Sequence, residues 1–497
     1  MSSLHPIMLA GTGSDVGKSV VATALCRIFL QDGYHPAPFK AQNMALNSYA
    51  TPEGLEIGRA QAVQAEAAGL PCHTDMNPLV LKPQSDHTSQ VVLNGRPVGN
   101  KSAYDYWRAG QGFRQEVCAA FDRLAAKYNP IVMEGAGSIS EINLRDHDLV
   151  NMPMARHANA DVILVADIDR GGVFASAYGS IALQDEDDRR RIKGIIINKF
   201  RGDLRLFDEG RRMLENICKV PVLGVIPYFK NIYIEGEDSV ALEKRAQDSQ
   251  AQRSKVVVAV IMLQHLSNYT DFDALERDPR VHLFYTNNIS DIKRADIIIL
   301  PGTKSTLDDL YELRRNGCAQ AIVAAHREGA SVLGICGGYQ MMGMEVCDPH
   351  HVEGTIERLP GLGLLPTTTT MSGEKRTRQI TFTSPLLPQT SRLLKGYEIH
   401  NGATQPFGDA TLQPFARLED GTADGYVVSD RCMGTYIHGV LDNTDVADWL
   451  LAPFADRFGK EHATFDYQAF KQQQYDLLAD HVRKYLDMER LYEIMKG

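Results

Sequence analysis

Two short stretches of the sequence combine small residues with a reactive side chain, and each suits a different chemistry. The stretch "SVLGICGGYQMMG", residues 331–343, places Cys336 in a Gly-x-Cys-x-Gly frame directly after an apolar run. Small neighbours allow a sharp strand-to-helix turn, which exposes a nucleophilic thiolate and stabilises it at the helix N-terminus. The stretch "LAGTGSDVGKS", residues 9–19, has the composition of a phosphate-binding loop. The chain is therefore expected to combine thiol chemistry with phosphate chemistry.

The glycine-rich stretch follows an apolar run and precedes a helical segment, as a nucleotide-binding loop does. Glycines let backbone N–H groups turn toward an anion, the lysine reaches the outer phosphates, and the serine holds Mg²⁺. The loop departs from the strict pattern at Thr12, where a glycine is usual, and it contains Asp15. The alternative is a glycine-rich turn with no nucleotide. We predict ATP binding by Gly11, Thr12, Gly13, Gly17, Lys18 and Ser19.

Three further residues lie where such a site needs polar groups. Glu134 ends the run "PIVMEGAG" (130–137), so its carboxylate suits a Mg²⁺ ligand, although it also fits a surface carboxylate. Lys40 in "FKAQNM" is either a second phosphate contact or a solvated lysine, and Asn198 in "NKFRGD" either contacts adenine or caps a helix. The charge-dense loop 138–152, with Asp146, either orients a substrate or is a solvated connection.

A cysteine nucleophile needs a base and an oxyanion hole. His438 in "GTYIHGV" ends a later apolar run and is the preferred base, while His400 in "GYEIHNG" is its competitor. The backbone N–H of Gly337 supplies one half of the oxyanion hole. Gly302 in "PGTKST" (301–306) supplies the other half.

The elements that position these residues form two series of apolar runs alternating with helical segments. Continuous β-branched runs are typical of parallel strands buried on both faces. The fold class is therefore α/β, with two open, mostly parallel doubly wound sheets, the second of them flavodoxin-like. We expect a P-loop domain over 1–235, a polar linker over 236–255, a thiol domain over 256–445 and a helical tail over 446–497. The tail is expected to dock on the thiol domain.

Composition narrows the function classes. The chain has 497 residues, 44% of them hydrophobic, with a net charge of −10 and no basic run, which argues against a nucleic-acid partner. Its eight cysteines form no Cys-x-x-Cys pair, so a disulfide framework is not expected and a reducing cytoplasm is the expected location. No signal peptide and no membrane-spanning run are found.

The motifs together resemble a known enzyme family. "GICGGYQ" with "GTYIHG" resembles class I glutamine amidotransferase domains, and "GTGSDVGKS", "VMEGAGS" and "INKFRGD" resemble dethiobiotin-synthetase-like P-loop ligases. Their combination is similar to the cobyrinic and cobyric acid amidases of cobalamin biosynthesis. Stretches such as "EIGRAQAVQA", "GSISEINLRDHDLVNM" and "GYEIHNG" are closer to the cobyric acid synthase family. The resemblance covers about residues 6–442.

The resemblance implies a glutamine-hydrolysing carbon–nitrogen ligase with no tightly bound prosthetic group. Glutamine is hydrolysed at Cys336 through a thioester, and ATP with Mg²⁺ converts a substrate carboxylate into an acyl phosphate that ammonia attacks. The implied substrate is adenosylcobyrinic acid a,c-diamide, amidated at carboxylates b, d, e and g. The alternatives are a cobyrinic acid a,c-diamide synthase or, in another class, a P-loop regulatory protein with an inactive glutaminase-like domain.

The resemblance also implies further site residues. Asp15, Glu56 and Glu134 would lie near Mg²⁺, and Asp146 would guide the carboxylate or the ammonia. Many class I amidotransferases carry a glutamate two residues after the histidine, but this chain has Val440 there. A Cys336–His438 dyad is therefore expected. The residue that orients His438 is left open between Glu398 and Asp442.

Overall fold

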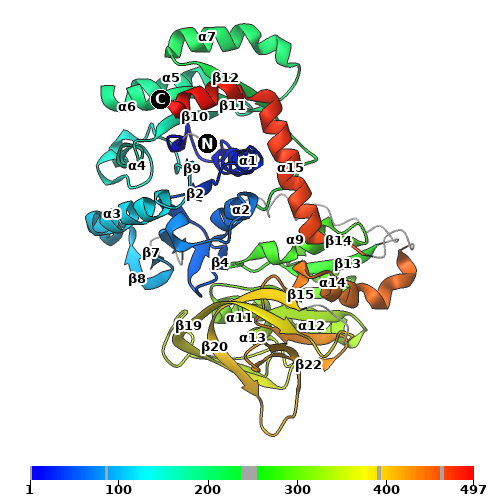
Figure 1. Ribbon diagram of the computed structural model, residues 1–497. Helices are drawn as coiled ribbons and strands as arrows, with labels where there is room; N and C mark the ends of the chain where they lie inside the picture. The colour runs from blue at the N-terminus through cyan, green and yellow to red at the C-terminus, as the bar shows by residue number, and fades with distance from the viewer. Residues whose placement is uncertain (1–2, 84–87, 237–254, 389–392, 459–463) are drawn as a thin grey trace. The chain divides into compact units, whose positions relative to one another are not determined.

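The computed structural model describes residues 3–83, 88–236, 255–388, 393–458 and 464–497 (Figure 1). The chain divides into two compact units. The phosphate unit comprises Met1–Ala45, Leu55–Glu235 and Phe470–Gly497, and the thiol unit comprises Leu46–Gly54 and Gly236–Ala469. The expected linker, 236–255, lies almost entirely outside the described residues. No helix among the described residues is both long and apolar enough to cross a membrane.

The phosphate unit is built on a parallel sheet, as the apolar runs predicted. Its strand order is β12-β11-β10-β1-β9-β2, and every neighbouring pair is parallel. These strands are rich in isoleucine and valine and are buried on both faces. Their bounds are β1 Ile7–Gly11, β2 Ala37–Phe39, β9 Ile131–Glu134, β10 Asp161–Asp167, β11 Ile192–Phe200 and β12 Val222–Pro227.

Helices connect these strands, and a smaller sheet lies beside them. The helices are α1 Lys18–Gln31, α2 Arg59–Ala67, α3 Ala103–Ala125, α4 Met152–His157, α5 Val173–Ala182, α6 Glu186–Arg191 and α7 Asp208–Cys218. The smaller sheet has the order β3-β6-β7-β8, with β3 Gln42–Met44, β6 Leu79–Pro83, β7 Thr88–Leu93 and β8 Arg96–Ser102. Strands β1 and β9 are neighbours, with Leu9 beside Glu134, so the loops that follow them leave the same edge of the sheet.

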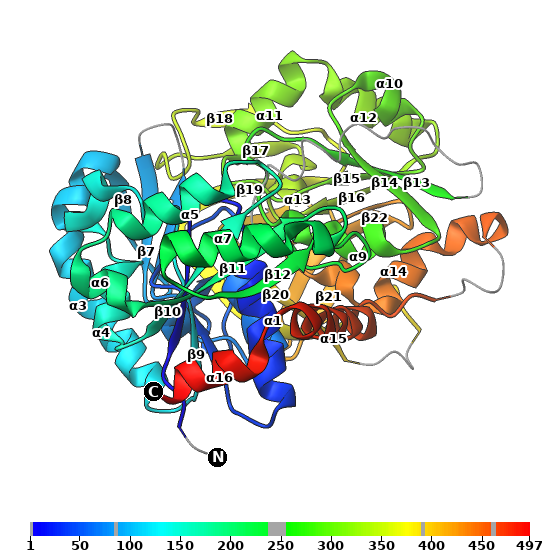
Figure 2. The ribbon, with the colours of Figure 1, turned by 90° about the horizontal axis from the view of Figure 1, so that it is seen from above.

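The C-terminal tail divides between the two units: residues 446–469 belong to the thiol unit, as expected, whereas residues 470–497 belong to the phosphate unit, which differs from the expected docking. Helices α15 (Tyr467–Tyr485) and α16 (Met488–Lys496) lie against α1 in both views (Figures 1 and 2). Arg27 on α1 donates to Asp476 at 2.7 Å, and the rings of Phe29 and Tyr492 are 5.7 Å apart. The physical reason is an apolar face on the tail, including Leu478, that is buried in the same core as α1.

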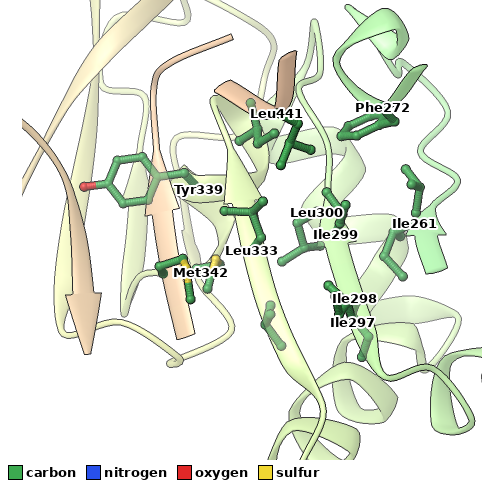
Figure 3. Close-up of a cluster of buried hydrophobic side chains, with 14 of the residues drawn as sticks. Ile261, Phe272, Ile297, Ile298, Ile299, Leu300, Leu333, Tyr339, Met342 and Leu441 are labelled. Carbon is green, nitrogen blue, oxygen red and sulfur yellow. The ribbon is translucent and has the colours of Figure 1, made fainter. Parts of the chain in front are cut away.

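The thiol unit begins with a parallel half-sheet that matches the second series of apolar runs. Its order is β14-β13-β15-β16-β23, with parallel pairing throughout. The bounds are β13 Val256–Ile261, β14 Val281–Thr286, β15 Ile297–Leu300, β16 Ser331–Ile335 and β23 Cys432–Thr435. Figure 3 shows the core of this half, where side chains of β15 and Leu333 of β16 pack beside Phe272 and Leu441. The α/β fold class is confirmed in both units.

The rest of the thiol unit's sheet is largely antiparallel, and the sequence analysis did not predict it. Strands β22 (Ala423–Ser429), β21 (Gln413–Leu418) and β19 (Thr367–Thr383) continue the sheet from β23, and β20 (Leu394–Pro406) pairs with β19. Strands β17 (Glu345–Cys347) and β18 (Arg358–Pro360) complete it. Strand β19 mixes buried and exposed polar residues, and in β20 the buried run Tyr397–His400 includes a glutamate and a histidine, so neither strand has the continuous apolar run that identified the other strands.

Candidate active sites

The glycine-rich loop lies between β1 and α1, and Lys18 closes over it. The Lys18 ammonium donates to the carbonyl of Gly13 at 2.9 Å and to that of Gly137 at 3.0 Å. A Cβ at Gly11 would stand 2.9 Å from the Gly13 carbonyl oxygen as well as 2.6 Å from Lys18 Nζ, so the close backbone approach favours a glycine there. Gly17 has φ 97° and precedes the first helical residue. The loop therefore has the backbone geometry of an anion-binding turn at a helix N-terminus.

Glu134 is the centre of a buried polar cluster beside this loop. Its Oε1 accepts from Ser19 Oγ at 2.9 Å and from Lys40 Nζ at 2.8 Å, and its Oε2 accepts from Gln64 Nε2 at 2.7 Å. Glu134 is 2% exposed. The structure thus brings together three predicted residues, Ser19, Lys40 and Glu134. Gln64 of α2 joins them, although its sequence context did not single it out.

Hydroxyl and carboxylate oxygens are the hard donors that Mg²⁺ takes, so the Ser19–Glu134 pair fits this ion. The two other predicted ligands are held elsewhere. Asp15 forms an ion pair with Arg170 at 3.2 Å, and buried Glu56 pairs with Lys82 of β6. Among the described residues there is no group of three or more His, Cys, Asp or Glu side chains placed to hold a metal.

Asn198 and Thr12 hold the loop in shape. The Asn198 amide donates to the carbonyl of Val16 at 2.9 Å, and a Cβ at Gly17 would stand 2.1 Å from Asn198 Nδ2. The Thr12 N–H donates to Val165 of β10 at 3.1 Å. Asn198 thus supports the backbone of the loop, a contact that neither the adenine reading nor the helix-cap reading had foreseen.

Asp146 lies exposed on a short 3₁₀ helix, Ile142–His147. The loop around it is fixed by other side chains. Arg145 donates to the carbonyl of Leu183 at 2.9 Å, and Asp148 Oδ1 accepts from the N–H of Val150 at 2.7 Å. The Asp146 carboxylate therefore remains on the surface of the phosphate unit.

In the thiol unit, Cys336 occupies the turn between β16 and α13 (Gly337–Met341). Its backbone has φ 52° and ψ −112°, a strained conformation for a residue with a side chain. A Cβ at Gly338 would meet the Leu300 carbonyl at 2.0 Å, and one at Gly337 would meet Thr303 Cγ2 at 2.6 Å. The small residues of the motif are therefore required by close backbone approach. This is the geometry of a nucleophile turn.

His438 is held beside this turn by a carboxylate that the sequence analysis missed. Its Nδ1 lies 2.7 Å from Asp271 Oδ2, and the N–H of Gly439 donates to Asp271 Oδ1 at 2.9 Å. Gly302 lies between the two reactive residues, because a Cβ there would stand 3.2 Å from His438 Cε1 and 3.7 Å from Cys336 Cβ. Cys336, His438 and the predicted oxyanion glycines therefore converge.

The neighbours of His438 favour its charged form. Burial alone would lower the pKa of His438, but the charges of Asp271 and Cys336, and hydrogen bonds with both, raise it to about 10. Of the two predicted orienting residues, Glu398 forms an ion pair with Arg378 at 2.5 Å. Asp442 ends a short turn in which its N–H donates to the Gly439 carbonyl at 3.1 Å. Asp271 is the carboxylate that contacts the imidazole.

His400, the competing base, is in a different environment. Its ring stacks on Tyr436 with centroids 3.7 Å apart, and its Nδ1 lies 3.1 Å from the Gly402 carbonyl. Burial, together with the nearby Arg376 charge, lowers the pKa of His400 to about 3. It lines a polar cavity of about 560 Å³, which also includes Glu398 and Asp424. His400 is therefore a wall residue of this cavity, held against Tyr436.

No motif or spacing in the sequence distinguishes Asp271 from its neighbours, and only the folded structure identifies it. It follows β13 by ten residues in "HLSNYTDFDAL", on a 3₁₀ turn, Tyr269–Phe272. Two other aspartates, Asp273 and Asp278, stand close to it in the sequence. A carboxylate on a loop after a parallel strand is only a general hint, and the direction of its side chain depends on the turn.

Comparison with known proteins matches both halves of the chain. Residues 7–240 match the CobQ/CobB/MinD/ParA nucleotide binding domain, and residues 257–446 match the CobB/CobQ-like glutamine amidotransferase domain. The curated relatives include the cobyric acid synthases of Bacteroides fragilis and Phocaeicola vulgatus. The Bacteroides fragilis enzyme is 69% identical over 99% of both chains. The Phocaeicola vulgatus enzyme is 66% identical over 100% of this chain and 99% of its own length. The cobyric acid synthase of Citrobacter koseri is 46% identical over 99% of this chain and 98% of its own length.

Proposed function

Because this chain belongs to the cobyric acid synthase family, we propose that it is an ATP- and glutamine-dependent ligase that amidates corrinoid carboxylates. The substrate we propose is adenosylcobyrinic acid a,c-diamide, amidated at carboxylates b, d, e and g. The proposal is supported by two features of one chain: a glycine-rich loop with Lys18 and Ser19 beside Glu134, and the His438–Asp271 pair near Cys336. Neither site suffices alone for glutamine-dependent amidation. The thiol site releases ammonia, and the phosphate site is needed because a carboxylate is a poor electrophile until it is phosphorylated.

In the thiol unit, we propose that the Cys336 thiolate attacks the glutamine carboxamide carbon. The backbone N–H groups of Gly302 and Gly337 are proposed to stabilise the oxyanion. His438 then gives its proton to the departing ammonia, and water hydrolyses the thioester to glutamate. The Asp271 contact supports this assignment, because it fixes the tautomer and orientation of the imidazole and stabilises its charged form.

In the phosphate unit, we propose that the loop from Gly11 to Ser19 binds the ATP phosphates, with Lys18 and Lys40 contacting the outer ones. Ser19 and Glu134 are the residues proposed to hold Mg²⁺. When bound, the ion neutralises phosphate charge as the phosphoryl group moves to the substrate carboxylate. Ammonia attacks the acyl phosphate, and inorganic phosphate leaves as the amide bond forms.

The remaining predicted residues are assigned more limited roles. We propose that Thr12 and Asn198 keep the loop in its anion-binding shape, and that Asp146 guides the substrate from its exposed position. Asp15 and Glu56 are proposed as Mg²⁺ ligands only if ATP binding releases them from Arg170 and Lys82. The Ser19–Glu134 pair needs no such rearrangement.

Mass spectrometry of the corrinoid product tests the proposal. The protein is incubated with adenosylcobyrinic acid a,c-diamide, glutamine and Mg-ATP. Each amidation replaces a carboxyl hydroxyl by an amino group, a mass change that a spectrometer resolves. Four successive changes support the proposed reaction. Two changes on cobyrinic acid, with none on its a,c-diamide, would favour the a,c-diamide synthase instead. No change on either substrate, with ATP still bound, would exclude a corrinoid ligase.

A further inference from the structure

Residues 46–54 belong to the thiol unit although the chain on both sides of them belongs to the phosphate unit. Lys40, which contacts Glu134, precedes this segment by six residues, and the buried Glu56 follows it by two. The contacts of this segment that are described below all lie within the thiol unit, which contains Cys336 and His438.

Tyr49 of the segment packs on the residue that supports the catalytic imidazole. The rings of Tyr49 and Tyr397 have centroids 4.5 Å apart, and Tyr397 in turn stacks on His438 with centroids 5.2 Å apart and planes 21° apart. The backbones of Tyr397 and His438 also exchange hydrogen bonds, at 2.8 and 3.1 Å. Tyr397 thus fixes both the main chain and the ring of His438, and Tyr49 covers Tyr397.

The same segment contacts the turn that carries Asp271. The N–H of Ser48 donates to Asn268 Oδ1 at 3.1 Å, and the N–H of Asp271 donates to the Asn268 carbonyl at 3.0 Å. Asn268 has φ 52°, so its backbone is in the left-handed region and depends on such support. Gln379 on β19 adds a hydrogen bond to the Ala50 carbonyl at 2.9 Å. The segment therefore touches both supports of His438, the stacked ring and the Asp271 turn.

Asn47 suggests that this seated arrangement is finely balanced. It is 2% exposed, and neither Nδ2 nor Oδ1 has a hydrogen-bond partner among the described residues. Burial of an amide without hydrogen-bond partners is unfavourable.

We propose that Tyr49 is a positioning residue for glutamine hydrolysis, acting through Tyr397 on His438. The proposal rests on the proposed function, because it assigns the glutaminase site to Cys336 and His438. Displacements of a catalytic group by about 1 Å can reduce rates roughly 100-fold, so loss of the Tyr49 ring is sufficient to slow the chemical step.

The test measures glutamate release by the full-length protein carrying Tyr49→Ala, Tyr49→Phe or Glu53→Ala. Glu53 is an exposed residue of the same segment and serves as the matched control. We expect Tyr49→Ala to lower kcat roughly 10- to 100-fold with little change in KM, and to shift the pH profile of kcat/KM. Tyr49→Phe keeps the ring and restores the rate, and Glu53→Ala behaves as the unmodified protein.

Amidation driven by ammonium chloride separates the possible failures. If Tyr49→Ala retains this activity and also retains a normal glutaminase kcat and pH profile, the proposal is overturned. If Tyr49→Ala loses both glutamine hydrolysis and ammonium-driven amidation, the same two assays are applied to Tyr49→Leu, which fills the space without a ring. A Tyr49→Leu variant with normal glutaminase kcat and pH profile then overturns the proposal. If the unmodified protein hydrolyses glutamine but amidates no corrinoid, the proposed function fails while the role of Tyr49 can still be decided from glutamate release.

Discussion

The phosphate site and the thiol site differ in how far apart in the sequence their cooperating residues lie. Lys18 and Ser19 lie in the same nine-residue loop as the glycines they serve, and the contributions from outside the loop include those of Lys40, Gln64, Glu134, Gly137 and Asn198. The thiol site instead collects Asp271, Cys336 and His438 from three loops, each following a different strand. The first site is a local backbone device, whereas the second exists only when the sheet has formed.

The sharpest expectation from this comparison is a division of labour between two substitutions. Lys18→Ala removes the cation that crosses the loop, so it should abolish amidation with glutamine and with ammonium chloride alike. Cys336→Ser should abolish glutamine-driven amidation and leave the ammonium-driven reaction. Product formation from each nitrogen source is the measurement. Persistent ATP-dependent amidation in Lys18→Ala would remove the phosphate assignment.

The second expectation concerns Asp271, the member of the thiol site that is most distant in sequence. Asp271→Asn removes the charge that raises the pKa of His438 and disturbs the tautomer held by the 2.7 Å contact. Glutaminase kcat should fall roughly 10²- to 10⁴-fold, as expected when an orienting carboxylate is lost. The ammonium-driven reaction should be unchanged.

Glu398→Gln is a matched comparison, because Glu398 was the alternative orienting residue and instead pairs with Arg378. Its effect on glutaminase kcat should be much smaller than that of Asp271→Asn. An equal or larger loss in Glu398→Gln would show that the carboxylate at Nδ1 is not what orients the imidazole.

The contrast also explains which features the sequence could predict. Apolar runs such as 192–200 predicted strands because burial on both faces leaves no polar alternation. The glycines around Lys18 and Cys336 predicted turns because close backbone approach excludes a Cβ, and the structure has such approaches at Gly11 and Gly338. In both cases the physical constraint acts on neighbouring residues.

What could not be predicted depends on contacts between distant segments. Asp271 is one of several nearby acidic residues, and its contact with His438 spans 167 positions. The tail pairs with α1 across more than 440 positions, for example Arg27 with Asp476. Strands β19 and β20 carry no continuous apolar run, so the pairing of β19 with β21 and of β20 with β19 follows from the completed sheet rather than from their own composition.

The smallest expected effect concerns Asp424. Its hydrogen-bond partners are the neutral groups of Thr435 and Tyr436, whereas Glu134 in the phosphate unit contacts the charged Lys40. Asp424 is 5% exposed, and burial raises its pKa to about 7 despite the hydrogen bonds from Thr435 and Tyr436. Between its usual value near 4 and this value, the folded state binds more protons than the unfolded state. The free energy of unfolding should therefore fall as pH rises from about 4 to 7.

Asp424→Asn keeps an acceptor for the Thr435 hydroxyl but cannot ionise, so it should flatten this part of the stability profile. Each pKa unit corresponds to about 1.4 kcal/mol. The gain in unfolding free energy that Asp424→Asn gives at pH 8 is therefore at most on the order of 4 kcal/mol. Urea unfolding at several pH values, with exposed Asp430→Asn as the control, provides the measurement. If Asp424→Asn and Asp430→Asn change the profile equally, the pH dependence arises from general charge and not from burial of Asp424. A selective effect would place a titrating, stability-limiting group in the thiol unit and extend the contrast between the two sites to their electrostatics.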